Sequence, residues 1–138
     1  MQDRMLNILL VEDDQVDVMN VRRAFEKNKI LNPLVVAGDG IEALAMLRQG
    51  KVPAGRRIIL LDLNMPRMNG IEFLRELRAD AKLGMTPVIV LTTSNAEKDR
   101  VDAYNLNVAG YLLKPVTFVN FVEVMAALNK YWTLVELP

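Results

Sequence analysis

Polar side chains that could do chemistry stand directly after short apolar segments of this chain. They are an acidic triplet, a single aspartate, a threonine and a lysine: Glu12–Asp14, Asp62, Thr92 and Lys114. Carboxylates gathered at one place repel one another when ionised, by roughly 3 kcal/mol for a pair about 5 Å apart at an effective dielectric of about 20. A retained proton or a divalent cation would relieve that repulsion.

The available residue types narrow the choice of cation and of reaction. The 138 residues include no cysteine and no histidine, so thiol ligands, imidazole ligands and the usual general base are excluded. Oxygen donors alone favour Mg²⁺ over Ca²⁺ or Zn²⁺. A carboxylate can accept a phosphoryl group without a general base. Mg²⁺, the Lys114 ammonium and the Thr92 hydroxyl could then each hold one phosphoryl oxygen.

Five apolar segments of strand length alternate with segments that begin like helices. The apolar segments are Leu6–Val11, Leu34–Ala37, Ile58–Leu61, Val88–Leu91 and Ala109–Leu113. Because they are apolar throughout, they are typical of parallel strands covered on both faces. Caps at Asp14, Asp39, Asn69 and Thr117, and a regular capping box at Ser94–Glu97, mark the helix starts. We therefore predict an α/β fold, a (βα)₅ doubly wound parallel five-stranded sheet, and choose the flavodoxin-like order 2-1-3-4-5.

In such a sheet the polar residues share one edge, where ligands bind. Taken singly, Glu12 and Thr92 are more simply interpreted as a helix-cap residue and a turn residue, and Lys114 could mark the end of a strand. Asp62 differs, because a charge set against an apolar strand is rarely left without a partner. Their conjunction at several strand ends favours a functional site.

Bulk properties exclude several classes of protein. Lys and Arg total 17 and Asp and Glu total 17, so the chain lacks the basic excess of a nucleic-acid-binding surface. No apolar run approaches the roughly 20 residues of a membrane span, and the N-terminus has no secretory pattern. We expect a cytoplasmic protein with one domain over residues 1–138, a core at about 6–130 and an apolar tail at 131–138.

Four motifs resemble the response-regulator receiver family over about residues 6–130: Ile8–Asp14, Leu60–Gly70, Val90–Ser94 and Gly110–Pro115. The resemblance implies a two-component response regulator with Asp62 as phosphoacceptor. It implies Mg²⁺, with Mn²⁺ as an alternative, bound by Asp13, Asp62 and the main-chain carbonyl of Asn64. Glu12 would act through a bound water.

The resemblance also implies a switch. Thr92 and Lys114 would contact the phosphoryl group, and the inward movement of Thr92 would let Tyr111 rotate from exposed to buried. That rotation would alter the surface of the fourth helix, fifth strand and fifth helix, although Tyr111 could also be an ordinary edge-strand aromatic. The Lys114–Pro115 peptide would be cis. Asn64 and Ser94 would tune how fast the phosphoryl group is lost.

The expected donor is a phosphohistidine on a histidine kinase or phosphotransfer protein. No output module follows before Pro138, so we expect a stand-alone receiver. The loop Asp62–Gly70 and the tail Lys130–Leu137 look closest to single-domain regulators of phytochrome-type kinases. The tail's apolar residues, beyond the fifth helix, either fold back or form an intermolecular surface. We favour a homodimer through the tail, fourth helix, fifth strand and fifth helix; the apolar residues are Tyr131, Trp132, Leu134, Val135 and Leu137.

Three other functions compete with this interpretation. An aspartyl-phosphate phosphatase would need a second acid where this chain has Asn64, so we expect no enzyme activity beyond slow self-dephosphorylation. A flavin carrier would need a phosphate-binding loop after the first strand, where Glu12–Asp14 would repel a phosphate. A degenerate receiver acting only as a scaffold is disfavoured, because all the reactive residues are present.

Overall fold

Five strands and five helices alternate along the part of the chain that the computed structural model describes, residues 5–138. The strands are β1 (Asn7–Val11), β2 (Leu34–Ala37), β3 (Arg57–Leu61), β4 (Val88–Thr92) and β5 (Gly110–Leu113). The helices are α1 (Gln15–Lys27), α2 (Gly40–Arg48), α3 (Gly70–Ala79), α4 (Glu97–Asn105) and α5 (Phe118–Leu134). Each strand lies within one residue of the bounds predicted from the apolar segments.

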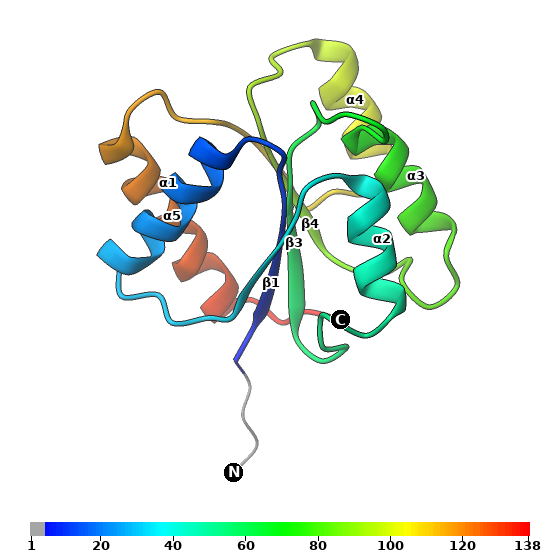
Figure 1. Ribbon diagram of the computed structural model, residues 1–138, viewed down its shortest axis with the longest axis horizontal. Helices are drawn as coiled ribbons and strands as arrows, with labels where there is room; N and C mark the ends of the chain where they lie inside the picture. The colour runs from blue at the N-terminus through cyan, green and yellow to red at the C-terminus, as the bar shows by residue number, and fades with distance from the viewer. Residues whose placement is uncertain (1–4) are drawn as a thin grey trace.

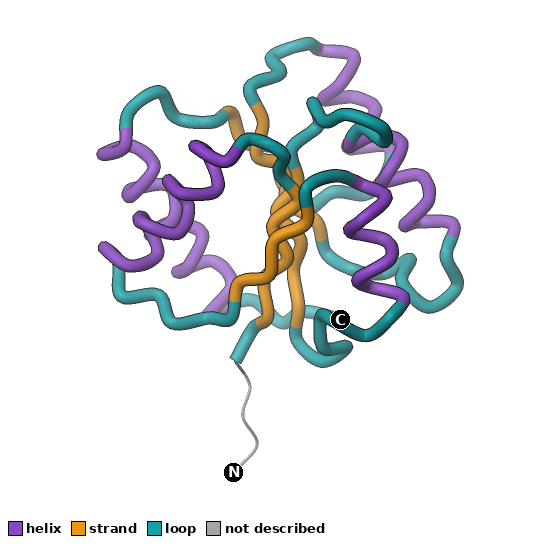
Figure 2. Tube along the Cα trace, viewed as in Figure 1, coloured by secondary structure: helices purple, strands orange, loops and turns teal. Residues whose placement is uncertain are grey.

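The strands form one parallel sheet in the order β2-β1-β3-β4-β5, which confirms the predicted fold and strand order. Figure 2 shows the sheet as the central layer, with helices on both sides. In the register of β1 and β3, Val11 pairs with Leu61. The residues that follow them, Glu12 and Asp62, therefore emerge side by side at the carboxyl edge.

Two apolar layers explain why the strands are apolar apart from a few end residues. Leu9 and Ile59 face the layer beneath α2 and α3, whereas Ile8 and Ile58 face the layer beneath α1 and α5. Figure 1 shows α1 and α5 on one side of the sheet and α2, α3 and α4 on the other. Since successive strand residues point to opposite faces of the sheet and helices cover both faces, the residues on both faces must be apolar.

The caps of four helices lie where the sequence predicts them, but the predicted Ser94–Glu97 capping box is wrong. Asp14, Asp39, Asn69 and Thr117 each accept backbone N–H hydrogen bonds in the first turn of a helix. The cap of α4 is instead Ala96, which makes no side-chain capping bond. The Ser94 hydroxyl donates to Asp99 Oδ2 at 2.5 Å. The first helical residue is Glu97, so Ser94 lies before the cap, where its hydroxyl oxygen accepts the Ala96 N–H at 3.4 Å rather than an N–H of the first helical turn.

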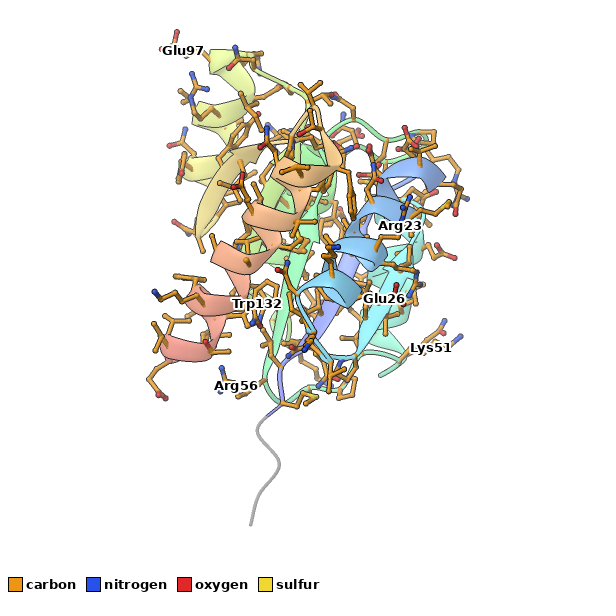
Figure 3. The ribbon with its side chains drawn as sticks, turned by 90° about the vertical axis from the view of Figure 1, so that its left-hand side faces the viewer. Arg23, Glu26, Lys51, Arg56, Glu97 and Trp132 are labelled. Carbon is orange, nitrogen blue, oxygen red and sulfur yellow. The ribbon has the colours of Figure 1, made fainter. Side chains whose placement is uncertain are left out.

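The C-terminal residues correct a second expectation, because α5 continues to Leu134 and includes half of the predicted tail. Trp132 is 1% exposed, and its ring centroid lies 6.2 Å from that of Phe25 on α1. Figure 3 shows Trp132 near Arg56, whose Nη2 donates to the Trp132 carbonyl at 3.0 Å. Tyr131 and Leu134 are 40% and 75% exposed. The predicted apolar cluster is therefore divided between the core and the surface.

No helix within the described residues is both long enough and apolar enough to cross a membrane.

Candidate functional site

The loops that follow β1, β3, β4 and β5 meet at one edge of the sheet, at the top of Figure 1. Backbone bonds hold neighbouring loops together: the Asp62 N–H donates to the Val11 carbonyl at 3.0 Å, and the Lys114 N–H donates to the Thr92 carbonyl at 2.8 Å. The sheet therefore sets the positions of the predicted site residues.

Three carboxylates converge at this edge. Glu12, Asp13 and Asp62 each offer an oxygen, and these oxygens lie within 4.8 Å of one another. Glu12 and Asp62 are buried, whereas Asp13 is exposed. Asp62 Oδ1 is buried without a hydrogen-bond partner among residues 5–138. A buried, unpaired carboxylate oxygen is costly, and hard oxygen donors at this spacing are the ligands that Mg²⁺ takes. The donor set therefore fits the predicted cation.

Lys114 is the counter-ion of these acids. Its Nζ lies 2.7 Å from Glu12 Oε1, 2.7 Å from Asp17 Oδ2 and 3.5 Å from Asp62 Oδ2, and its side chain is 7% exposed. Burial alone would lower the pKa of Lys114, but its bonds to Asp17 and Glu12 outweigh burial and raise the pKa above its usual range. The lysine is therefore charged throughout the physiological pH range.

Asp17 is the site residue that sequence reasoning missed. It stands three residues after the cap Asp14, where an acid can complete a capping box. In the structure its carboxylate bonds Lys114 instead, and the Asp14 N–H donates to Glu12 Oε2 at 3.1 Å.

Glu12 is held near the boundary between its two protonation states. Burial raises its pKa from 4.5 to about 7, and the charge of Asp62 adds to this effect. Bonds from Lys114 and from the Asp14 N–H work in the opposite direction. A cation bound among these carboxylates would favour the ionised form.

Thr92 and Tyr111 connect the acidic cluster to the loop that precedes α4. Thr92 is completely buried, and its hydroxyl accepts the Ser94 N–H at 3.3 Å. Tyr111 is half-buried, and its hydroxyl donates to the Ser94 carbonyl at 2.9 Å. Both side chains thus contact one residue of the β4–α4 loop. The rotation of Tyr111 stays a prediction.

Asn64 lies at the open side of the site. It lines a cleft of about 420 Å³ together with Asp13 and Asp99, and its Nδ2 lies 3.5 Å from the Thr93 hydroxyl. Arg67 ties the same β3–α3 loop to the start of α2, because its Nε donates to Asp39 Oδ2 at 2.7 Å. The carbonyl of Asn64 is therefore carried by an anchored loop.

The predicted cis bond between Lys114 and Pro115 is wrong. This peptide is trans, and no cis peptide occurs among the described residues. The trans isomer is the one that X–Pro bonds prefer, by about 0.5–1 kcal/mol. From this backbone the Lys114 ammonium still reaches Glu12 and Asp17.

The sequence profile of the response regulator receiver domain matches residues 8–126. The chain belongs to this family. It is a receiver domain of the two-component type, a signalling protein. Receiver domains accept phosphoryl groups from histidine kinases and bind Mg²⁺ at an acidic pocket.

Several relatives resemble this receiver over nearly its whole length. Response regulator Rcp1 of Synechocystis is 36% identical over 135 residues, which cover 95% of this chain and 92% of Rcp1. The probable methanogenesis regulatory protein FilR2 of Methanothrix harundinacea is 36% identical over 127 residues, 91% of this chain and 82% of FilR2. The solved structure of the phosphorylated cyanobacterial phytochrome response regulator RcpA superposes with a TM-score of 0.88 at 32% identity, covering 99% of both chains.

Proposed function

We propose that this receiver accepts a phosphoryl group on Asp62 from a partner's phosphohistidine. A carboxylate oxygen of Asp62 attacks phosphorus, and the bond from phosphorus to the imidazole nitrogen breaks. The observation that carries the proposal is the setting of Asp62: it is buried, one oxygen has no partner among the described residues, and the other lies 3.5 Å from the Lys114 ammonium. A nucleophile so placed needs positioning and charge neutralisation rather than a general base.

Mg²⁺, or Mn²⁺ in its place, would be held by Asp13, Asp62 and the main-chain carbonyl of Asn64, with Glu12 acting through a water. When bound, the cation would neutralise charge on the phosphoryl oxygens. The close approach of three carboxylates supports this assignment. A relative solved in a Mn²⁺-bound form, Rcp1, superposes with a TM-score of 0.83 at 36% identity, over 97% of this chain and 99% of that one.

Thr92 and Lys114 would hold the other phosphoryl oxygens. Thr92 ends β4 beside the lysine, as the backbone bond between them shows. Asn64 and Ser94 border the site and would tune how fast water removes the phosphoryl group. Because an asparagine stands where a phosphatase would carry its second acid, slow self-dephosphorylation is the only turnover we expect.

The output would be a change in the surface of α4, β5 and α5. Tyr111 lies on β5 and is bonded to the loop that leads from Thr92 to α4, so a shift of Thr92 would be felt by both elements. Large apolar side chains are exposed on this surface, namely Val101, Tyr104, Leu113, Val116, Val119, Tyr131 and Leu134.

This exposed apolar surface supports a homodimer. Light scattering over a concentration series, with and without beryllofluoride and Mg²⁺, tests it directly. A dimer mass that Leu134→Asp reduces is the expected result, and a monomer mass under every condition would contradict it. The likeness to RcpA supports a phytochrome-type histidine kinase as the partner.

The decisive experiment on the acceptor is incubation with Mg²⁺ and acetyl phosphate, followed by intact-mass measurement. We expect the native chain to gain one phosphoryl group and Asp62→Asn to gain none. Asp102→Asn is a matched control, because it alters a half-buried acid on α4 that pairs with the exposed Lys98. Equal modification of Asp62→Asn and the native chain would overturn the assignment.

A further inference from the structure

Asp17 brings a fourth carboxylate to the site, from a helix rather than from the end of a strand. It is the third residue of α1, and its side chain is 21% exposed. Its Oδ2 lies 2.7 Å from the ammonium of Lys114, which is itself 7% exposed. A short contact to a buried lysine makes Asp17 part of the electrostatics of the site.

The ammonium of Lys114 is directed towards other acids more than towards Asp62. A lysine has three N–H donors. Contacts at 2.7 Å with Asp17 and Glu12 use two of them, whereas the 3.5 Å separation from Asp62 Oδ2 exceeds an ordinary hydrogen bond. An anion attached to Asp62 would have to draw the ammonium towards itself.

We propose that Asp17 is a positioning residue that competes with an anion on Asp62 for the Lys114 ammonium, and so weakens the hold of the site on a phosphoryl group. The inference rests on the proposed role of Asp62. Asp17 opposes the anion in two ways. It accepts one N–H of the Lys114 ammonium, and it adds a negative charge near an anion on Asp62, where solvent screens charges poorly. Removing its charge would release one N–H donor of Lys114, which could then bind the anion.

A purely helical role for Asp17 predicts a different result. An acid in the first turn favours a helix through the macrodipole, and a loss of that effect would change stability without changing the affinity for an anion. The neighbouring acid Asp14 supplies the control. Its side chain caps α1 by accepting the Val16 and Asp17 N–H groups. Asparagine caps a helix about as well, so Asp14→Asn removes the same charge from the same turn without touching the lysine contact.

The test measures the affinity for beryllofluoride, an analogue of the phosphoryl group, at a Mg²⁺ concentration that saturates each variant. We expect Asp17→Asn to bind it roughly fivefold more tightly than the native chain, and Asp14→Asn to change the affinity by less than about twofold. Asp17→Glu should stay near the native affinity, because its carboxylate can still reach Lys114. Unchanged or weaker binding by Asp17→Asn, or an equal gain in Asp14→Asn, would overturn the inference.

A second readout needs neither the anion nor the cation. In chelator, Lys114 of Asp17→Asn should react faster with an amine-acetylating reagent than Lys114 of the native chain or of Asp14→Asn, as measured by peptide mass spectrometry. Equal rates would count against the competition. Asp62→Asn separates the two proposals: if it binds beryllofluoride as the native chain does, the proposed acceptor is wrong. If it loses binding while Asp17→Asn matches the native chain, only the role of Asp17 fails.

Discussion

Lys114 lies closer to the carboxylate of Asp17, on α1, than to that of Asp62, the predicted phosphoacceptor. Its Nζ is 2.7 Å from Asp17 and 3.5 Å from Asp62. One ammonium therefore compensates several acids that the fold forces together. With Glu12 and Asp13 included, the cluster carries more negative than positive charge. Its stability should depend on the lysine, on pH and on divalent cations.

Replacing Lys114 by methionine should destabilise the protein strongly in the absence of divalent cations. Buried carboxylates would be left without their counter-ion, which typically costs about 3–5 kcal/mol. Urea denaturation at pH 8 in chelator measures the loss, and Mg²⁺ should restore part of it. Lys98→Met is the control, because Lys98 is 81% exposed and pairs with Asp102 in the next helical turn. It should cost less than about 0.5 kcal/mol, and equal losses for the two variants would contradict the role of Lys114.

The raised pKa of Glu12 predicts a pH dependence of stability with a definite sign. Between pH 4.5 and about 7 the folded protein binds more protons than the unfolded chain, because the folded pKa is about 7. The free energy of unfolding should therefore fall as pH rises through this window. Glu12→Gln removes the titrating group and should flatten the slope, as measured by urea denaturation in chelator. The raised pKa of Lys114 changes the free energy of unfolding only above about pH 10.5, the usual pKa of a lysine. A slope that survives in Glu12→Gln would assign the effect to another group.

The sequence predicts the sheet and its edge well, because strand composition and the geometry of parallel crossovers leave few alternatives. Asp62 and Lys114 could be placed together on that basis alone. Asp17 could not, because its role depends on how α1 is rotated against the sheet, and an acid at that position is equally suited to capping. Ser94 was misassigned because a capping-box pattern does not fix the first helical residue, which is Glu97, and the bond from the Ser94 hydroxyl to Asp99 is found only once the loop is folded.

Replacing Gly70 by alanine should disturb the loop that carries Asn64. A Cβ on Gly70 would lie 2.7 Å from the carbonyl oxygen of Asp62 and from the Cα of Leu63, which are backbone atoms that cannot turn away. We expect a loss of about 2 kcal/mol or more in the free energy of unfolding and weaker Mg²⁺ binding by calorimetry. Gly55→Ala is the control, since nothing lies within 4 Å of its Cβ. Native Mg²⁺ affinity in Gly70→Ala would show that the loop position does not matter to the cation.

Arg78 should be a structural residue that lysine cannot replace. Its guanidinium donates to the carbonyls of Leu106, Gly84, Thr86 and Asn107 at 2.6–3.1 Å, and so joins α3 to the segments before β4 and β5. A lysine lacks the planar fork needed to reach all four. Arg78→Lys should lower the free energy of unfolding by roughly 2 kcal/mol. Arg75→Lys, on the exposed side of the same helix, should leave it unchanged, and a similar loss in both would refute the carbonyl contacts as the cause.

Two neighbouring aromatic residues at the end of α5 should differ in their effect on stability: Trp132 should stabilise the fold, and Tyr131 should contribute little. Trp132 is 1% exposed, packs against Phe25, and donates its indole N–H to Asn129 Oδ1 at 3.0 Å. Trp132→Ala should therefore cost about 3–5 kcal/mol, seen as a lower denaturation midpoint of a dilute sample. The adjacent Tyr131 is 40% exposed, so Tyr131→Ala should cost less than about 1 kcal/mol under the same conditions. If Tyr131→Ala lost as much stability in dilute solution, this tyrosine would belong to the fold of the single chain, and its availability to a second copy would be ruled out.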